Sequence, residues 1–98
     1  MGRLIVINTY LATSREFQPI VVEKSVNGIA VKVTTGVQYV VVPKGTSLAT
    51  GTPRDPDTLD GEIGFYTDQL TSGYWEVGVR VIATPETPFI SCGLIRIK

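Results

Sequence analysis

The chain has 98 residues, of which 43% are hydrophobic and 18% are charged, and nine basic residues balance nine acidic ones. This composition excludes an intrinsically disordered chain and predicts one folded domain over residues 1–98, because the hydrophobic content is sufficient for collapse. A net charge of zero argues against nucleic acid as a partner, since no long-range field gathers phosphates. The sequence also lacks any run of the roughly 20 apolar residues that a membrane crossing requires.

The ends of the chain and its cysteine bear on the compartment. Arg3 is followed only by the apolar run 4–7, which is too short for a secretory signal. Cys92 has no second cysteine with which to pair, so we expect a buried thiol that packs as a small apolar residue. These observations predict a soluble protein that is made in a cytoplasm without a signal peptide.

Seven runs rich in Val, Ile and Tyr, separated by turn residues, predict β-strands along the chain. The predicted strands are residues 3–8, 17–26, 29–34, 37–42, 62–67, 74–83 and 89–98. Pro19 places the second strand at a sheet edge, because proline cannot donate to a strand ladder. Asn27-Gly28, between the second and third strands, predicts a type I′ hairpin turn. In the fourth strand, most residues at both odd and even positions are apolar. This pattern predicts a central strand that is covered on both faces.

Residues 43–61 are rich in Pro, Gly, Thr and Asp and show no sustained periodicity, so they are expected to form one long loop. Loops of this length in small domains often bind partners. We therefore expect the charged residues of this loop to contact a partner protein; they are Arg54, Asp55, Asp57 and Asp60.

The same acidic run invites a calcium interpretation, because carboxylates beside a glycine offer hard oxygen ligands. The spacing does not fit, since an EF-hand loop that starts at Asp55 needs a bidentate Glu at its twelfth position, where this chain has Tyr66. Asp and Pro are also ordinary turn residues. No metal ligand and no cofactor is assigned, and calcium binding by the loop stays open.

No segment of useful length has apolar residues at helical spacing, so the predicted class is all-β. Seven strands with turn signals every 8 to 12 residues predict a single-domain antiparallel β-sandwich with one long loop. The stretch Gly73-Tyr74-Trp75-Glu76-Val77 resembles the Gly-x-Tyr-x-Cys pattern in the penultimate strand of immunoglobulin-like domains. Trp75 replaces the tyrosine and Val77 the cysteine, so the resemblance implies neither a tyrosine corner nor an inter-sheet disulfide. The sandwich is expected to be immunoglobulin-like or jelly-roll-like.

Alternation along the sixth predicted strand separates an inner from an outer face. The residues at odd positions are expected in the core; they are Trp75, Val77, Val79 and Val81. Tyr74 is at an even position and is expected on the surface, where an aromatic ring can stack on a sugar.

The sequence contains few of the residues and motifs that commonly carry catalysis. The chain has no histidine and one cysteine, which removes imidazole bases, triads and cysteine-based zinc sites. No phosphate-binding glycine motif is present. We therefore expect a protein that is not an enzyme.

Residues 4–7, and residues 94–97 apart from Arg96, are apolar at both odd and even positions. This is unusual for strands at a solvated edge and suggests cover by another copy. The expected function is a structural or attachment module that binds itself, as a homo-oligomer, and another protein. Such a module is compatible with a virion component, such as a capsid decoration or tail protein. The alternative is a carbohydrate-binding module or a small protein inhibitor.

Overall fold

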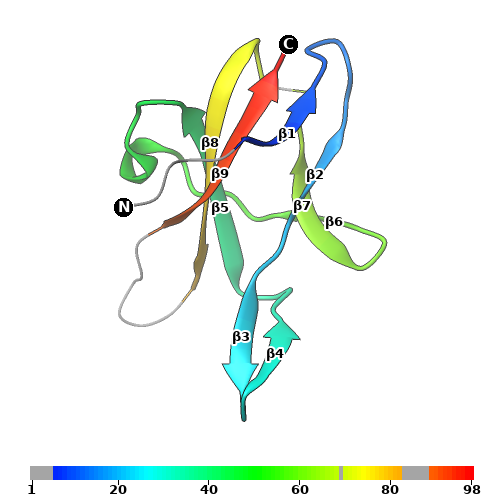
Figure 1. Cartoon of the computed structure of the whole chain (residues 1–98), viewed down its shortest axis with the longest axis vertical. Helices are drawn as coiled ribbons and strands as arrows, with labels where there is room; N and C mark the ends of the chain where they lie inside the picture. The colour runs from blue at the N-terminus through cyan, green and yellow to red at the C-terminus, as the bar shows by residue number, and fades with distance from the viewer. Residues whose placement is uncertain (1–5, 69, 83–88) are drawn as a thin grey trace.

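The computed structural model describes residues 6–68, 70–82 and 89–98 (Figure 1). The described residues form strands, one short 3-10 turn and connecting loops, which confirms the all-β class. The elements are β1 (Val6–Tyr10), β2 (Phe17–Ile20), β3 (Glu23–Val26), β4 (Ile29–Lys32), β5 (Val37–Pro43), η1 (Leu48–Thr50), β6 (Asp57–Leu59), β7 (Glu62–Tyr66), β8 (Gly73–Val81) and β9 (Ile90–Ile97).

The strands belong to three sheets (Figure 1). One has four strands in the order β1-β9-β8-β5, a second has three in the order β2-β7-β6, and β3 and β4 form a separate hairpin. All pairs are antiparallel except β1 with β9, which is parallel. The expectation of a purely antiparallel arrangement is therefore wrong for β1. A parallel pair needs a long connection, and these two strands stand near opposite ends of the chain.

The predicted strand at residues 17–26 is two strands. β2 pairs with β7 and ends at Ile20, and β3 begins at Glu23 and pairs with β4. Pro19 lies in β2, an edge strand, as predicted. Asn27 and Gly28 have φ of 52° and 79°, so the turn predicted between β3 and β4 is also confirmed.

Strand β5 is covered on both faces, as predicted, but it is not central, because it ends the order of the four-stranded sheet. The segment that contains η1 covers its outer face: a Cβ on Gly51 would meet the side chains of Val40 and Val42. The free edge is partly capped, since the backbones of Tyr39 and Arg54 exchange hydrogen bonds of 3.0 and 2.9 Å. Such a cap protects an edge strand from further pairing.

Residues 43–61 are not one long loop. They contain η1, and they contain β6, which pairs with β7. The turn between these two strands is Asp60-Gly61, with φ of 50° and 79°. Asp-Gly is a strong type I′ turn signal, and the surrounding Pro and Thr residues obscured it in the sequence.

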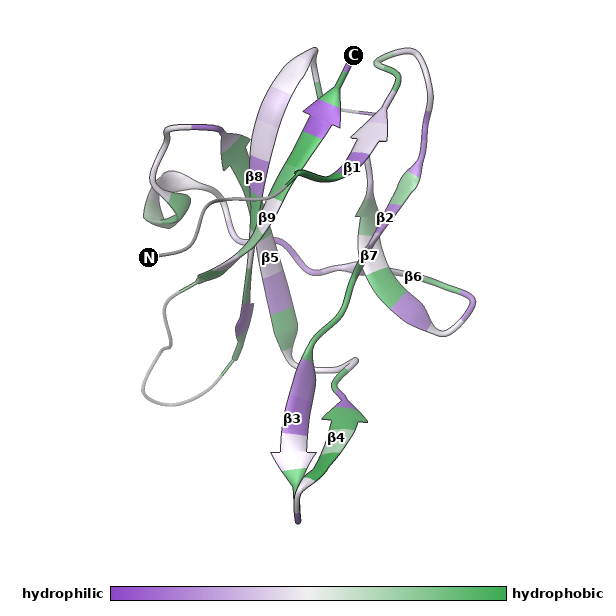
Figure 2. Ribbon diagram, in the orientation of Figure 1, coloured by the Kyte–Doolittle hydropathy of each residue, from purple (hydrophilic) through white to green (hydrophobic). Residues whose placement is uncertain are grey.

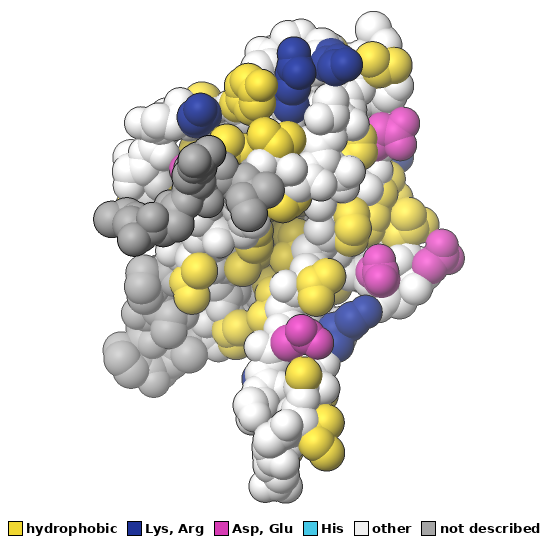
Figure 3. Space-filling view, in the orientation of Figure 1, with side chains coloured by type: hydrophobic (Ala, Val, Ile, Leu, Met, Phe, Trp, Pro, Cys, Tyr) yellow, Lys and Arg dark blue, Asp and Glu magenta, His cyan; other side chains and the backbone are white. Residues whose placement is uncertain are grey.

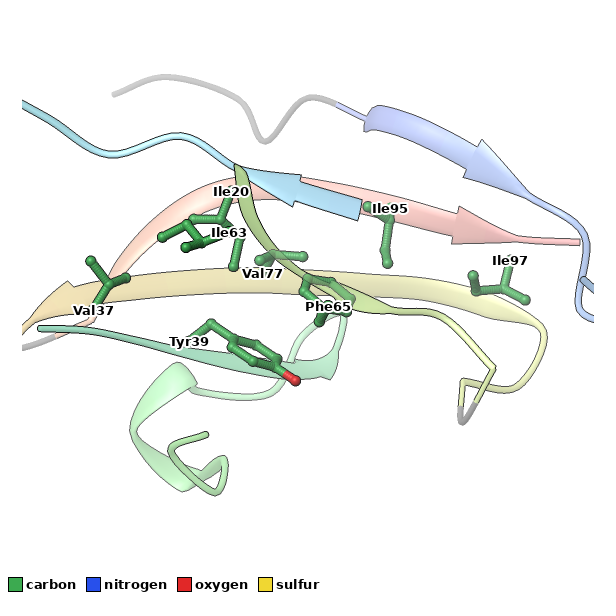
Figure 4. Close-up of a cluster of buried hydrophobic side chains, with 8 residues drawn as sticks. All are labelled: Ile20, Val37, Tyr39, Ile63, Phe65, Val77, Ile95 and Ile97. Atoms are coloured by element: carbon green, nitrogen blue, oxygen red, sulfur yellow. The ribbon is translucent and has the colours of Figure 1, made fainter. Parts of the chain in front are cut away.

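The core combines side chains from the two larger sheets (Figure 4). The three-stranded sheet contributes Ile20, Ile63 and Phe65, and the four-stranded sheet contributes Val37, Tyr39, Val77, Ile95 and Ile97. The rings of Tyr39 and Phe65 stack at 4.8 Å between centroids and 12° between planes. Burial of these apolar side chains is the main force that holds the two sheets together.

The last strand is interior to its sheet, because β9 lies between β1 and β8. Leu94, Ile95 and Ile97 are buried within the chain itself, so they do not require cover by another copy. Val6 and Ile7 on the edge strand β1 are exposed, and residues 4 and 5 lie outside the described residues. The described part of the chain has no helix long and apolar enough to span a membrane.

Candidate functional site

The four charged residues predicted to bind a partner are all exposed, but the structure does not bring them together as one acidic loop. Asp57 lies in β6 and Asp60 in the following turn. The backbone of Arg54 is hydrogen-bonded to the backbone of Tyr39 at the edge of β5. Within the described residues, no group of three or more Asp, Glu, Cys or His side chains is placed to hold a metal ion. The carboxylates are dispersed because the run folds into a hairpin.

Tyr74 is 42% exposed and lies on β8, as its place in the alternation predicts. Two cations flank its ring: Lys44 Nζ lies 5.5 Å and Arg96 Cζ 5.7 Å from the ring centroid. These are cation–π distances. A sugar platform needs an open ring face with neighbouring acceptors for hydroxyl groups, and the described ring contacts of Tyr74 are cationic instead.

The hairpin of β3 and β4 extends from one end of the body (Figure 1), and residues 23–32 are called the arm below. Every residue of both strands is exposed. At its base, Val33 N donates to Val22 O at 2.7 Å, and Lys32 Nζ lies 3.7 Å from Glu62 Oε1. The ion pair is exposed at both partners, so it contributes little to the position of the arm.

The two faces of the arm differ in character. Val26 pairs with Ile29, and Lys24 pairs with Val31. Because paired residues share a face, Val26, Ile29 and Val31 form an apolar face that is interrupted only by Lys24. The hydropathy colouring shows β4 as strongly hydrophobic and the first half of β3 as hydrophilic (Figure 2).

Further apolar side chains are exposed near the base of the arm. Ile82 N donates to Gly36 O at 2.6 Å, which places the end of β8 beside the segment that follows the arm. Val81, Ile82 and Ile90 are all exposed. Val81 was expected in the core, but it is exposed: it pairs with Val37 of β5 and lies beyond the last residue of β8 that pairs with β9. Figure 3 shows hydrophobic side chains on the arm and on the neighbouring face of the body.

Sequence reasoning missed the arm as a surface. The hairpin itself was predicted, since the Asn27-Gly28 turn joins the polar run 23–25 and Val26 to the apolar run 29–31. The sequence did not indicate that no third strand of the described residues pairs with this hairpin, because that depends on where the chain leaves β2.

A pocket of about 220 Å³ opens beside the core cluster. Four of its lining residues are aromatic: Tyr39 on β5, Phe65 and Tyr66 on β7, and Trp75 on β8. Trp75 was expected in the core, and it is partly buried as one wall of this pocket. Its indole Nε1 donates to Thr71 O at 2.8 Å, which fixes the orientation of the ring.

Among the described residues, Val41 and Leu70 complete the apolar lining, and Arg54 is the charged residue of the pocket. The ion pairs among the described residues are Arg15 with Asp68 and Lys32 with Glu62, and neither includes Arg54. Burial raises the pKa of Tyr39, the positive charge of Arg54 opposes that rise, and Asp57 adds to it. The Arg54 guanidinium therefore acts electrostatically on the Tyr39 hydroxyl.

Cys92 is exposed, so the expectation of a buried thiol is wrong. Val77 pairs with Gly93 and the next residue of β8 pairs with Ser91, so Cys92 is the extra residue of a β-bulge. Partial burial still raises the pKa of the thiol, which keeps it protonated near neutral pH and weakly nucleophilic.

The chain matches no protein-family model, no curated protein and no solved structure. Its function is therefore inferred from its own surfaces.

Proposed function

We propose that this protein is a non-enzymatic structural or attachment module that self-associates through the arm. We further infer that its two larger sheets form a β-sandwich of seven strands, from which the arm extends between β2 and β5. Sheets of four and three strands match the immunoglobulin-like arrangement better than a jelly roll, which has two sheets of four strands.

The observation that carries the proposal is the exposed apolar face of the arm. A two-stranded hairpin alone is marginally stable in water, and it normally needs a third strand or a packed face. The arm has neither within the described part of its own chain. Cover of Val26, Ile29 and Val31 by another molecule would supply the missing packing.

A second copy of the chain is a suitable occupant. Its formal net charge of zero produces no long-range repulsion between copies, and proteins near zero net charge associate more readily. Each copy also offers exposed apolar side chains on its body, including Val81, Ile82 and Ile90 beside the base of the arm. Repeated contacts of this kind suit a module that decorates a larger assembly, such as a virion, together with another protein.

The test is the solution mass by light scattering after size exclusion over a dilution series. We expect the wild-type chain to form a dimer or larger oligomer, and the Ile29→Asp variant to dissociate at a concentration at least about tenfold higher. Loss of one buried Ile side chain corresponds to roughly 1.5–3 kcal/mol, or about 10- to 100-fold in affinity. Ile29 is exposed, so the variant should keep the fold of the body.

The matched control is Leu11→Asp, because Leu11 is 57% exposed and Ile29 is 67% exposed. Ala12 N donates to Lys98 O, so Leu11 lies at the C-terminal end of β9, the opposite end from Ile90 and the base of the arm. The control should associate within about threefold of wild type if the arm makes the dominant contact. A wild-type chain that is monomeric at every concentration would overturn self-association. Dissociation by Leu11→Asp but not by Ile29→Asp would overturn the role of the arm.

A further inference from the structure

We propose that the pocket between β5, β7 and β8 binds a small aromatic carboxylate, whose ring enters the aromatic walls and whose carboxylate pairs with Arg54. This inference concerns a different surface from the arm and does not depend on self-association.

The size of the pocket selects a ligand with one ring. An apolar cavity of roughly 150 Å³ can hold benzene, and this pocket has about 220 Å³. The remaining volume accommodates a short chain and a carboxylate. The pocket is open to solvent, so its volume describes the enclosed part of the ligand. The volume is also below the roughly 300 Å³ at which pockets for drug-sized ligands begin.

The walls are arranged for an aromatic guest. The stacked pair of Tyr39 and Phe65 extends from the core and is fixed by its packing. Trp75 is held by its hydrogen bond to Thr71. Aromatic rings prefer offset-stacked or edge-to-face contact with such walls, at separations of about 4.5–7 Å. A preformed pocket avoids the cost of ordering side chains on binding.

The polar groups of the pocket favour an anion. Arg54 is exposed, lines the pocket and has no ion-paired carboxylate among the described residues. The Tyr39 hydroxyl has no hydrogen-bond partner among the described residues. Every buried side-chain polar atom in that part of the chain does have a partner, so the Tyr39 hydroxyl is accessible to solvent or ligand. A guanidinium and a phenol can both donate to one carboxylate.

The same polar groups argue against a sugar in this pocket. Sugar hydroxyls need acceptors as well as donors, and the described lining residues include no Asp, Glu, Asn or Gln. A neutral hydrocarbon would fill the walls but leave the Arg54 charge without a partner. A carboxylate on the ligand would supply the ion-pair partner of the Arg54 guanidinium.

The experiment titrates the protein with 3-phenylpropionate and follows the fluorescence of Trp75, which is the single tryptophan of the chain and a wall of the pocket. We expect a saturable change with a dissociation constant on the order of 1 mM, as befits a ligand of this size. The neutral analogue 3-phenylpropanol should bind at least about tenfold more weakly, because a charge-assisted hydrogen bond is lost.

The variant Arg54→Gln should weaken 3-phenylpropionate about tenfold or more and leave 3-phenylpropanol unchanged. The main-chain bonds between Arg54 and Tyr39 do not need the guanidinium, so the variant should fold; circular dichroism checks this. Arg96→Gln is the matched control, because Arg96 lies beside Tyr74 rather than in the pocket, and it should bind as wild type does.

Two results would overturn the proposal. One is the absence of any saturable change with 3-phenylpropionate in the folded wild-type protein. The other is equal binding of the acid and the alcohol, unaffected by Arg54→Gln, which would remove the recognition of a carboxylate. Neither result depends on whether Ile29→Asp changes the oligomeric state, so the two proposals fail separately.

Discussion

The hydroxyl of Tyr10 on β1 donates a 2.7 Å hydrogen bond to Oε1 of Gln18 on β2, and so joins strands of different sheets. Asn8 Nδ2 donates to the same oxygen at 3.2 Å, and Gln18 Nε2 donates to Pro19 O at 2.8 Å. Gln18 is only 4% exposed. A buried amide must have its hydrogen bonds satisfied, and here both ends of the amide are used.

Replacement of Gln18 by Leu should lower the free energy of unfolding by about 1–3 kcal/mol, because the partly buried Tyr10 hydroxyl loses its acceptor. Denaturant titration measures this change. In a double-mutant cycle with Tyr10→Phe, the double variant should lose less than the sum of the single losses. Strict additivity would show that the hydrogen bond contributes nothing to the junction.

Gly64 on β7 should not tolerate even alanine. A Cβ at this position would meet the backbone carbonyl oxygen of Gln18 and the ring of Phe17, so β2 would have to shift away from β7. We expect Gly64→Ala to destabilise the fold by about 3 kcal/mol or more, at the upper end of overpacking costs. Thermal unfolding would show this as a clear fall in Tm.

Gly61→Ala is the control for that prediction, because it makes the same chemical change in the same hairpin. Gly61 has φ of +79° and nothing within 4 Å of an added Cβ. Its cost is backbone strain of about 1–2 kcal/mol without a packing clash. A Gly64→Ala variant as stable as Gly61→Ala would contradict the close approach of β2 and β7.

Stability should fall at alkaline pH because of two tyrosines. Burial raises the pKa of Tyr10, with a smaller contribution from Glu16, and burial also raises the pKa of Tyr39. The folded state therefore holds both protons more tightly than the unfolded state. This contribution is fully present below the unfolded pKa of about 10 and is lost as the pH rises through that value toward the folded pKa.

Urea titrations at pH 8 and at about pH 11 would measure this loss. Tyr39→Phe and Tyr10→Phe should each show a smaller fall between the two pH values than wild type, because each removes one ionising group. Equal falls in all three proteins would mean that neither hydroxyl is responsible.

Much of the fold followed from local patterns in the sequence. The all-β class, the turn at Asn27-Gly28 and the edge position of Pro19 depend on backbone preferences and on donors that a residue has or lacks. The cover on both faces of β5 followed from its apolar residues on both parities. These properties belong to short stretches of chain, so the sequence alone is sufficient to predict them.

Other features were decided by contacts between distant segments. The break between β2 and β3, the edge position of β5 and the interior position of β9 depend on which strands pair, and pairing is set by the whole core rather than by local preference. The pocket also depends on contacts between distant segments, because Arg54 lies near Tyr39 and Trp75 only after β5, β7 and β8 pack together.

The sequence by itself therefore determined the class of fold, the turn at Asn27-Gly28 and the absence of histidine chemistry. The tertiary structure alone decided which apolar residues are covered and which stay exposed. Leu94 and Ile29 are both apolar strand residues. Leu94 is buried between neighbouring strands, whereas Ile29 lies on an arm that is joined by no third strand among residues 6–68, 70–82 and 89–98. Burial depends on the positions of all the other strands, and no local pattern contains that information.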